Sequence, residues 1–220
     1  MDKIVIVGSS GHARVIIDIV EQQGRDQLVG LIDSFRPVGE QTMGYEVLGD
    51  EQALVGLSKT MGITGAIIGI GDNGIRQRVA QKLAALCPEL RFVTAVHPSA
   101  SVGRQSQIGP GTVVMAGACI NPCSQVGQHC IINTRASLDH DSVVGDFASL
   151  APGVVTGGNV HIGAHSAVGI GATILHGRKV GEHTVIGASA TVIKDIPALT
   201  VAYGTPAKVV RTRQAGERYL

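Results

Sequence analysis

The sequence predicts a chain in two parts: a small Rossmann-like α/β domain with a parallel sheet over residues 1–95, and an all-β left-handed parallel β-helix over residues 96–220. Strand, turn and helix patterns alternate through the first part, and an aliphatic residue recurs at every sixth position through the second. The composition is 44% hydrophobic but only 3% aromatic, with 30 glycines. Small β-branched side chains and many glycines suit short strands joined by tight turns.

The first part of the chain alternates apolar runs with turns. Residues 3–7 are an apolar run that leads into a turn at positions 8–12, which reads GSSGH. Apolar residues at helical spacing follow over residues 13–23. Two further strands and a second helix are predicted over residues 28–32, 66–70 and 75–86. Because strands and helices alternate, we expect a parallel sheet with helical crossovers, ending near residues 91–98.

The second part follows a six-residue rule that only Thr156 breaks. The aliphatic residues at this spacing are Val96, Val102, Ile108, Val114, Ile120, Val126, Ile132, Leu138, Val144, Leu150, Ile162, Val168, Ile174, Val180, Ile186 and Val192. Glycine often comes next, and a small residue mostly comes four positions after the aliphatic one. Short fixed periods are typical of solenoids, and a period of six excludes an amphipathic helix. We expect a triangular coil in which aliphatic residues stack inward, small residues fill the remaining interior and glycines help the chain to turn.

Charge and apolar runs exclude several classes of protein. The formal net charge is +1 with no block of like charges, which argues against nucleic-acid binding. The first apolar run is too short for a signal peptide, and no stretch approaches the roughly 20 apolar residues of a membrane span. We therefore expect a cytoplasmic protein that neither binds nucleic acid nor spans a membrane.

The four cysteines are expected to be reduced thiols, as in cytoplasmic proteins. The spacing of Cys119, Cys123 and Cys130 is not that of a zinc knuckle, so no metal site is predicted. We expect Cys119 and Cys130 to point into the coil. Cys123 has no partnered base in the sequence, so no cysteine nucleophile is implied.

His140 is the candidate for acid–base chemistry. It lies two positions after an aliphatic repeat residue, where side chains leave the coil, and Asp141 follows it. A neighbouring carboxylate raises the basicity of an imidazole, and Asp139 is the alternative carboxylate. His176 has the same phase two coils later, roughly 10 Å away at about 4.8 Å per coil. A different phase forms a second column of histidines, His129, His165 and His183.

Three segments of the first part could bind a ligand. The turn at positions 8–12 lies between a strand and a helix, where backbone N–H groups favour a phosphate, although it is not a G-x-G-x-x-G fingerprint. Asp33 ends the second strand and could accept hydrogen bonds from a ribose or base. Gly71 follows the third strand. The carboxyl ends of parallel strands meet at one edge of a sheet, where ligands usually bind.

Three features together resemble a known family. They are the GSSGH turn at positions 8–12, the hexapeptide repeats, and a late YGTPAK segment at positions 203–208. The chain resembles the sugar O-acyltransferases, a hexapeptide-repeat family that includes sialic acid O-acetyltransferases and nucleotide-linked 4-amino-sugar N-acetyltransferases. The resemblance implies a homotrimer with active sites between subunits, acetyl-CoA as donor, and a nucleotide-linked sugar bound by the N-terminal domain.

The resemblance also implies roles for individual residues. His140 would be the general base, and Asp141 would raise its basicity. The residues implied to bind the nucleotide sugar are Ser10, Gly11, His12, Asp33 and Gly71. Those implied to bind the donor are Ser149, Ile170 and Ala188, with Lys208 and Arg211 near the phosphates of the coenzyme. Some family members carry a His at the position of Ser149, and serine matches neither the reach nor the basicity of an imidazole.

The resulting hypothesis is an acetyl-CoA-dependent N-acetyltransferase acting on a nucleotide-linked 4-amino-6-deoxy sugar in surface glycan biosynthesis. The nearest alternative is an O-acetyltransferase that acts on sialic acid or another sugar hydroxyl. An alternative of another class is a non-catalytic scaffold that binds a nucleotide sugar, against which the His140 and Asp141 pair argues. The sequence leaves the nucleotide and the sugar open.

Overall fold

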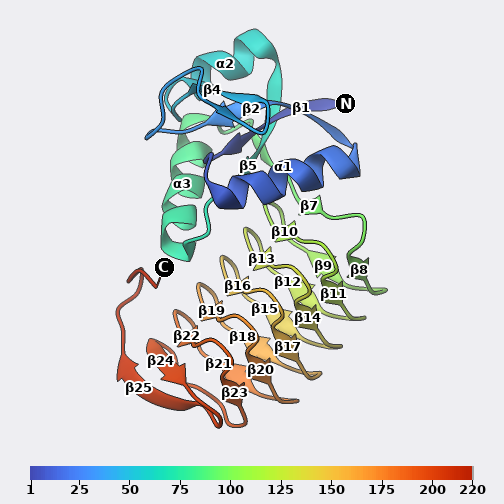
Figure 1. The fold of residues 1–220 in the computed structure, drawn as a ribbon, viewed down its shortest axis with the longest axis vertical. Coiled ribbons are helices and arrows are strands. Elements are labelled where there is room, and N and C mark those ends of the chain that lie inside the picture. The colour runs from blue at the N-terminus through green and yellow to red at the C-terminus, as the bar shows by residue number, and fades with distance from the viewer. Residues whose placement is uncertain (220) are drawn as a thin grey trace.

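The computed structural model describes residues 1–219, and it confirms the predicted two-part fold (Figure 1). The α/β unit is built on a six-stranded sheet with the strand order β3-β4-β2-β1-β5-β6. Its elements are β1 (Asp2–Val7), α1 (Gly11–Gln23), β2 (Asp26–Ile32), β3 (Gln41–Thr42), β4 (Tyr45–Gly49), α2 (Leu54–Met61), β5 (Ile63–Ile68), α3 (Asn73–Leu86) and β6 (Arg91–Phe92). β1 lies at the centre and pairs in parallel with β2 and β5.

Sequence reasoning found the long elements of this unit and missed the short ones. β3 and β6 are two residues each, too short for a hydrophobic period, and neither β4 nor α2 was predicted. The third predicted strand was placed too late, since β5 ends at Ile68. The chain leaves the sheet at Gly69, where a Cβ would lie 2.9 Å from Ile6 and 3.1 Å from Ala13.

The second unit is a left-handed parallel β-helix with three faces. Face one contains β7 (Ala95–Val96), β10 (Val113–Val114), β13 (Ile131–Ile132), β16 (Ser149–Leu150), β19 (Ala167–Val168), β22 (Val185–Ile186), β24 (Thr200–Tyr203) and β25 (Lys208–Thr212). Face two contains β8 (Ser101–Val102), β11 (Cys119–Ile120), β14 (Ser137–Leu138), β17 (Val155–Thr156), β20 (Thr173–Ile174) and β23 (Thr191–Val192). Face three contains β9 (Gln107–Ile108), β12 (Gln125–Val126), β15 (Val143–Val144), β18 (His161–Ile162) and β21 (Lys179–Val180).

The aliphatic repeat residues form the interior of this coil. Ile120, Leu138 and Ile174 are fully buried in one continuous core. Residues that pair in successive coils lie 18 positions apart, as three faces of six residues require. Burial of these stacked side chains removes apolar surface from water in every coil, which stabilises the solenoid throughout its length.

The repeat glycines serve a different purpose from the expected one. A Cβ at Gly103 would lie 2.5 Å from the backbone nitrogen of Pro122 in the next coil. These glycines therefore permit close approach between coils. The left-handed backbone conformation falls two residues later and is often adopted by other residue types, including Asp141 with φ of 56°.

The two units share a hydrophobic core. Val113, Met115 and Ile131 point outward from face one and pack against the group of buried side chains that includes Ile16 and Ile19 of α1. Figure 1 shows α1 lying over the first coils. Within the described residues, no helix is long and apolar enough to cross a membrane.

Arg76 of α3 joins the units by hydrogen bonds. Its side chain is 1% exposed, and all five N–H groups find acceptors. Nε donates to the His129 carbonyl at 2.8 Å and one Nη donates to the Phe147 carbonyl at 3.0 Å, both in the coil. The other acceptors are the carbonyls of Ile70 and Gly71 and the side chain of Asn73. The Arg76 side chain thus holds the segment that follows β5 against two coils of the β-helix.

Replacement of Arg76 is therefore expected to destabilise the protein. Arg76→Met keeps the aliphatic stem but leaves five oxygen acceptors without this donor, most of them buried. The cost should be on the order of 3 kcal/mol or more in the free energy of unfolding, measured by urea denaturation. Arg78→Met, an exposed position on the same helix, is the matched control and should change stability by roughly 0.5 kcal/mol or less. Equal effects of the two substitutions would contradict this role of Arg76.

Candidate active site

His140 and Asp141 form a pair at the corner between face two and face three. The imidazole Nδ1 lies 2.7 Å from Asp141 Oδ2, and the two side chains are 50% and 53% exposed. This hydrogen bond raises the pKa of His140 above its ordinary value. With Nδ1–H donated to the carboxylate, Nε2 carries the lone pair and can accept a proton.

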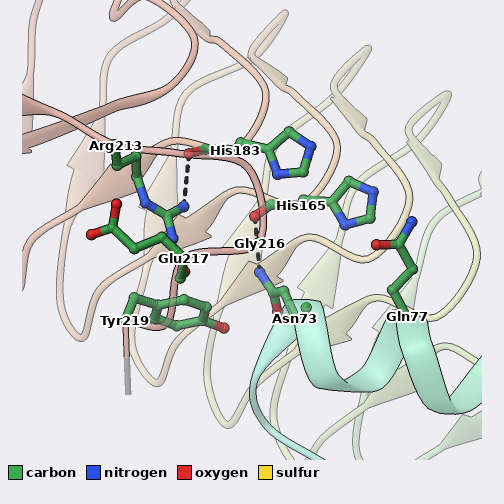
Figure 2. Close-up of a pocket in the computed structure, with 9 residues that line it drawn as sticks. Asn73, Gln77, His165, His183, Arg213, Gly216, Glu217 and Tyr219 are labelled. Carbon is green, nitrogen blue, oxygen red and sulfur yellow. Dashed lines mark hydrogen bonds between the residues drawn. The ribbon is translucent and has the colours of Figure 1, made fainter.

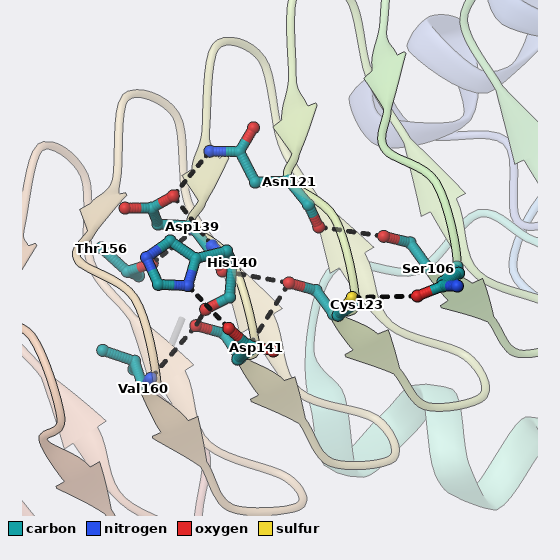
Figure 3. A network of polar contacts seen from close by, with 11 residues as sticks. Ser106, Asn121, Cys123, Asp139, His140, Asp141, Thr156 and Val160 are labelled. Carbon is teal, nitrogen blue, oxygen red and sulfur yellow. Dashed lines mark hydrogen bonds and ion pairs between the residues drawn. The ribbon is translucent and has the colours of Figure 1, made fainter.

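Asp139 is engaged by other partners (Figure 3). Its Oδ1 accepts hydrogen bonds from Asn121 Nδ2 at 2.7 Å and from the backbone N–H of His140 at 2.8 Å. The Asn121 hydrogen bond is the main reason that the pKa of Asp139 is lowered. Of the two carboxylates that the sequence offered, the one that contacts the imidazole is therefore Asp141.

His176 lies closer to His140 than the coil spacing indicated. The expected separation was roughly 10 Å for two coils, whereas the ring centroids are 6.3 Å apart. The coil between them places Gly158 at this phase, and a Cβ there would lie 2.6 Å from His140 Nε2. Since glycine has no side chain, the rings approach each other across the intervening coil.

The second histidine column lies at the corner between face three and face one. Phe147 stacks between His129 and His165 at centroid distances of 4.9 and 5.2 Å, and His183 stacks on His165 at 4.5 Å. Burial, followed by the charge of Arg76, lowers the pKa of His129 to about 4. Burial likewise lowers the pKa of His165 and of His183. A lowered pKa favours the neutral imidazole, so these rings stack on Phe147 and on one another.

The carboxyl ends of β1 and β2 form a cavity of about 330 Å³ that includes Ser10 and Asp33. Asp33 already accepts hydrogen bonds from the Ser9 hydroxyl at 2.6 Å and from the Phe35 N–H at 2.8 Å. Its carboxylate is thus held in place by the turn that precedes α1. Gly11 is exposed at the first position of α1 and lies outside this cavity.

A groove of about 600 Å³ runs along face one and its corner with face two. It contains the three positions that the resemblance assigns to the donor, namely Ser149, Ile170 and Ala188. It also contains His12 and Gly71, which the resemblance assigns to the nucleotide sugar. The structure therefore divides four of the five expected sugar-binding residues between two cavities and brings two of them beside the donor positions, while Gly11 lies in neither.

His12 is adapted to this groove as a neutral side chain. Burial, followed by the charge of Arg76, lowers its pKa to about 4. Its Nε2 is buried and has no hydrogen-bond partner within residues 1–219. A neutral imidazole with a free ring nitrogen can exchange a hydrogen bond with a ligand in the groove.

Tyr219 is a groove residue that the sequence did not indicate. Its hydroxyl lies 3.2 Å from Ser149 Oγ and donates to the Gly71 carbonyl at 3.3 Å. Arg213 holds the segment that carries it, since Nη1 donates to the His183 carbonyl at 2.7 Å (Figure 2). No repeat or motif marks position 219, which lies 70 positions from its partner at 149.

The two basic residues that the resemblance places near the phosphates of the coenzyme, Lys208 and Arg211, both lie on β25. Arg211 pairs with Glu217 at 2.7 Å, and this hydrogen bond raises the pKa of Arg211. Lys208 is exposed on β25.

One expectation for the cysteines is corrected. Cys130 is buried inside the coil, but Cys119 comes immediately before the aliphatic Ile120 and so points outward. The four cysteines are free, and no group of three or more His, Cys, Asp or Glu within residues 1–219 could hold a metal ion.

Comparison with known proteins places this architecture among enzymes. Residues 3–83 match the family described as the PglD N-terminal domain. The UDP-N-acetylbacillosamine N-acetyltransferase of Bacillus subtilis (strain 168) is 31% identical over 116 residues, which is 53% of this chain and 52% of that protein. The chain thus spans about half the length of this curated relative.

Two solved structures are similar over nearly the whole chain. A variant of perosamine N-acetyltransferase from Caulobacter crescentus, in complex with CoA and GDP-perosamine, is 34% identical, with 96% of this chain and 98% of that chain covered and a TM-score of 0.90. The acetyltransferase domain of PglB from Neisseria gonorrhoeae FA1090, in complex with acetyl coenzyme A, is 31% identical, with 94% and 98% covered and a TM-score of 0.86.

These similarities confirm the resemblance that the turn, the repeats and the late segment indicated. They extend over both units, with matching order and fold. The chain belongs to the family of hexapeptide-repeat acyltransferases that act on nucleotide-linked amino sugars.

Proposed function

We propose that this protein transfers the acetyl group of acetyl-CoA to the amino group of a nucleotide-linked 4-amino-6-deoxy sugar, with His140 as the general base. The observation that carries the proposal is the His140–Asp141 pair, an accessible imidazole with a carboxylate on one nitrogen and a lone pair on the other. The solved relatives support the substrate classes, because one is an N-acetyltransferase in complex with CoA and GDP-perosamine and the other is an acetyltransferase domain in complex with acetyl coenzyme A.

The chemistry needs little beyond positioning and a base. Acetyl-CoA supplies an activated carbonyl, and the sugar amine attacks it directly. The amine is nucleophilic only without its extra proton, and it loses a second proton as the new C–N bond forms. His140 Nε2 accepts a proton from the attacking nitrogen, and Asp141 stabilises the imidazolium that results. The coenzyme departs as a thiolate and takes up a proton to become the free thiol.

The proposed binding residues follow the two units. Residues 1–95 would form the nucleotide-sugar domain, with Ser10, Gly11 and Asp33 near the turn before α1. Residues 96–220 would form the acyltransferase domain. Ser149, Ile170 and Ala188 would bind the donor along the groove, where His12, Gly71 and Tyr219 bring the two substrates together.

We also propose a homotrimer. His140 lies at the corner between face two and face three, whereas the donor groove lies on face one and the corner between faces one and two. A second copy that presents its His140 corner to this groove would complete each site. Mixing two inactive variants, one lacking His140 and one altered in the groove, should restore activity, and light scattering should give the mass of a trimer. An active monomer would overturn this arrangement.

Acetyl-CoA and nucleotide sugars are cytoplasmic metabolites, so we infer a cytoplasmic location.

An acetyl-transfer assay with a panel of nucleotide-linked amino sugars tests the proposed substrate class. Purified protein is incubated with acetyl-CoA and with UDP-, GDP- and dTDP-linked 4-amino sugars, and release of free thiol is followed. We expect one of these amines to be acetylated, and mass spectrometry should place the acetyl group on nitrogen. Acetylation of a hydroxyl alone would favour the O-acetyltransferase alternative, and coenzyme binding without any turnover would favour the non-catalytic scaffold.

Loss of the base should abolish most of the activity. His140→Ala is expected to lower kcat by roughly 10²–10⁴-fold, the usual contribution of a positioned general base. The affinity for the nucleotide sugar and the assembly should barely change, because the imidazole leaves the coil. His176→Ala is the control at the same phase and should retain most of kcat. Near-normal turnover of His140→Ala would remove His140 from the mechanism.

The pH dependence of kcat/KM should show which carboxylate raises the pKa of His140. The Asp141 hydrogen bond raises the pKa of His140, and the base acts as neutral imidazole, so kcat/KM falls as the pH drops through that pKa. Asp141→Asn lowers the pKa and should move this acidic limb to lower pH, by about one unit or less at so exposed a site, and should reduce the maximum rate. Asp139→Asn should move the limb less. The reverse order would identify Asp139 as the tuning carboxylate.

A further inference from the structure

The single break in the aliphatic repeat lies directly beneath the His140 turn. Thr156 occupies an inward position that is aliphatic in the neighbouring coils, and it is 4% exposed. The strand pairing is also reduced here. β14 and β17 share one register pair, Ser137 with Val155, whereas β11 and β14 share two.

The Thr156 hydroxyl takes part in an unusual contact between coils. At the previous coil of the same corner, the N–H of Asn121 donates to the Leu138 carbonyl at 2.9 Å. One coil later, at the equivalent position, the N–H of Asp139 donates instead to the side-chain oxygen Thr156 Oγ1 at 3.0 Å (Figure 3). A side-chain oxygen thus takes the place of the ladder carbonyl as the acceptor at this turn.

The same coil supports His140 in two further ways. The N–H of Asn159 donates to the His140 carbonyl at 2.9 Å. Gly158 leaves room for the ring, since a Cβ there would lie 2.6 Å from both Cε1 and Nε2 of His140. Gly158 does not have a positive φ, so its backbone would accept other residues. Its small size is required by the imidazole and not by the turn.

We propose that Thr156 is a positioning residue for His140, acting with Gly158 as a cradle that holds the imidazole and its carboxylate partner in their working orientation. The inference rests on the proposed function. The Thr156 hydroxyl fixes the N–H of Asp139, and Asp139 in turn accepts the N–H of His140, so the contact reaches the base through two hydrogen bonds.

Valine at this position would restore the repeat and remove the hydroxyl. In Thr156→Val the Asp139 N–H is expected to return to the ladder carbonyl, which draws the turn toward the coil axis. The melting temperature should be unchanged or higher, because an aliphatic residue rejoins the core, while kcat falls roughly 10–100-fold with KM little changed. Thr156→Ser keeps the hydroxyl and should recover most of kcat. Gly158→Ala should also lower kcat, because the ring must move.

A readout that does not require turnover is the titration of His140, followed by NMR. Besides Asp139 and Asp141, the titratable and charged groups that share this corner within two coils of His140 are Arg104, Cys123, His176 and Arg178, and none of them is altered by the substitution. Displacement of the turn should weaken the hydrogen bond to Asp141, so the pKa of His140 should drop in Thr156→Val and return in Thr156→Ser. This experiment decides the inference even where no acceptor in the substrate panel is acetylated.

Thr112→Val is the matched control. Thr112 is a buried threonine of the same solenoid whose hydroxyl donates to the Gly127 carbonyl at 2.7 Å and accepts the Cys130 N–H at 2.9 Å, away from the His140 corner. Its loss should lower the melting temperature and leave kcat and the His140 titration unchanged. Wild-type kcat and titration in a folded Thr156→Val, or failure of folded Thr156→Ser to recover them, would overturn the proposal.

Discussion

The relation between the two units depends on one buried guanidinium. Arg76 satisfies five acceptors drawn from the sheet edge, from its own helix and from two coils, and none of them is a carboxylate. A buried charge is tolerated only when its hydrogen bonds are complete, so these partners must keep their relative positions. Two of these acceptors, the carbonyls of Ile70 and Gly71, follow β5, and Gly71 lines the groove along face one.

The same charge helps to separate the histidines into two classes. Near Arg76 and away from solvent, burial and the positive field keep His12 and His129 neutral, with pKa values of about 4. At the His140 corner the side chain is accessible and hydrogen-bonded to a carboxylate, which raises its pKa. The same residue type therefore has a lowered pKa beside Arg76 and a raised pKa beside Asp141, and the environment makes the difference.

Repeated hydrogen bonds between successive coils fix the position of each turn of the β-helix. Each turn is held by hydrogen bonds from the coil before it and the coil after it: Asp141 N–H donates to the Pro122 carbonyl, and the His140 carbonyl accepts from Asn159. A local departure from the repeat then changes only one turn. The departure at Thr156 coincides with the turn that carries the His140–Asp141 pair.

The sequence by itself determined the two-part fold, the inward aliphatic columns and the pairing of His140 with a neighbouring acid, because a period of six and adjacency along the chain are local properties. The sequence pattern did not predict the short strands β3 and β6, since two isolated residues show no hydrophobic period. Only the tertiary structure decided that Asp141 and not Asp139 contacts the imidazole, that His176 approaches across Gly158, and that Arg76 and Tyr219 reach the coil. Those contacts join residues from 18 to 148 positions apart or depend on side-chain orientation. They follow from how the coils stack and how the units pack, and no spacing in the sequence encodes them.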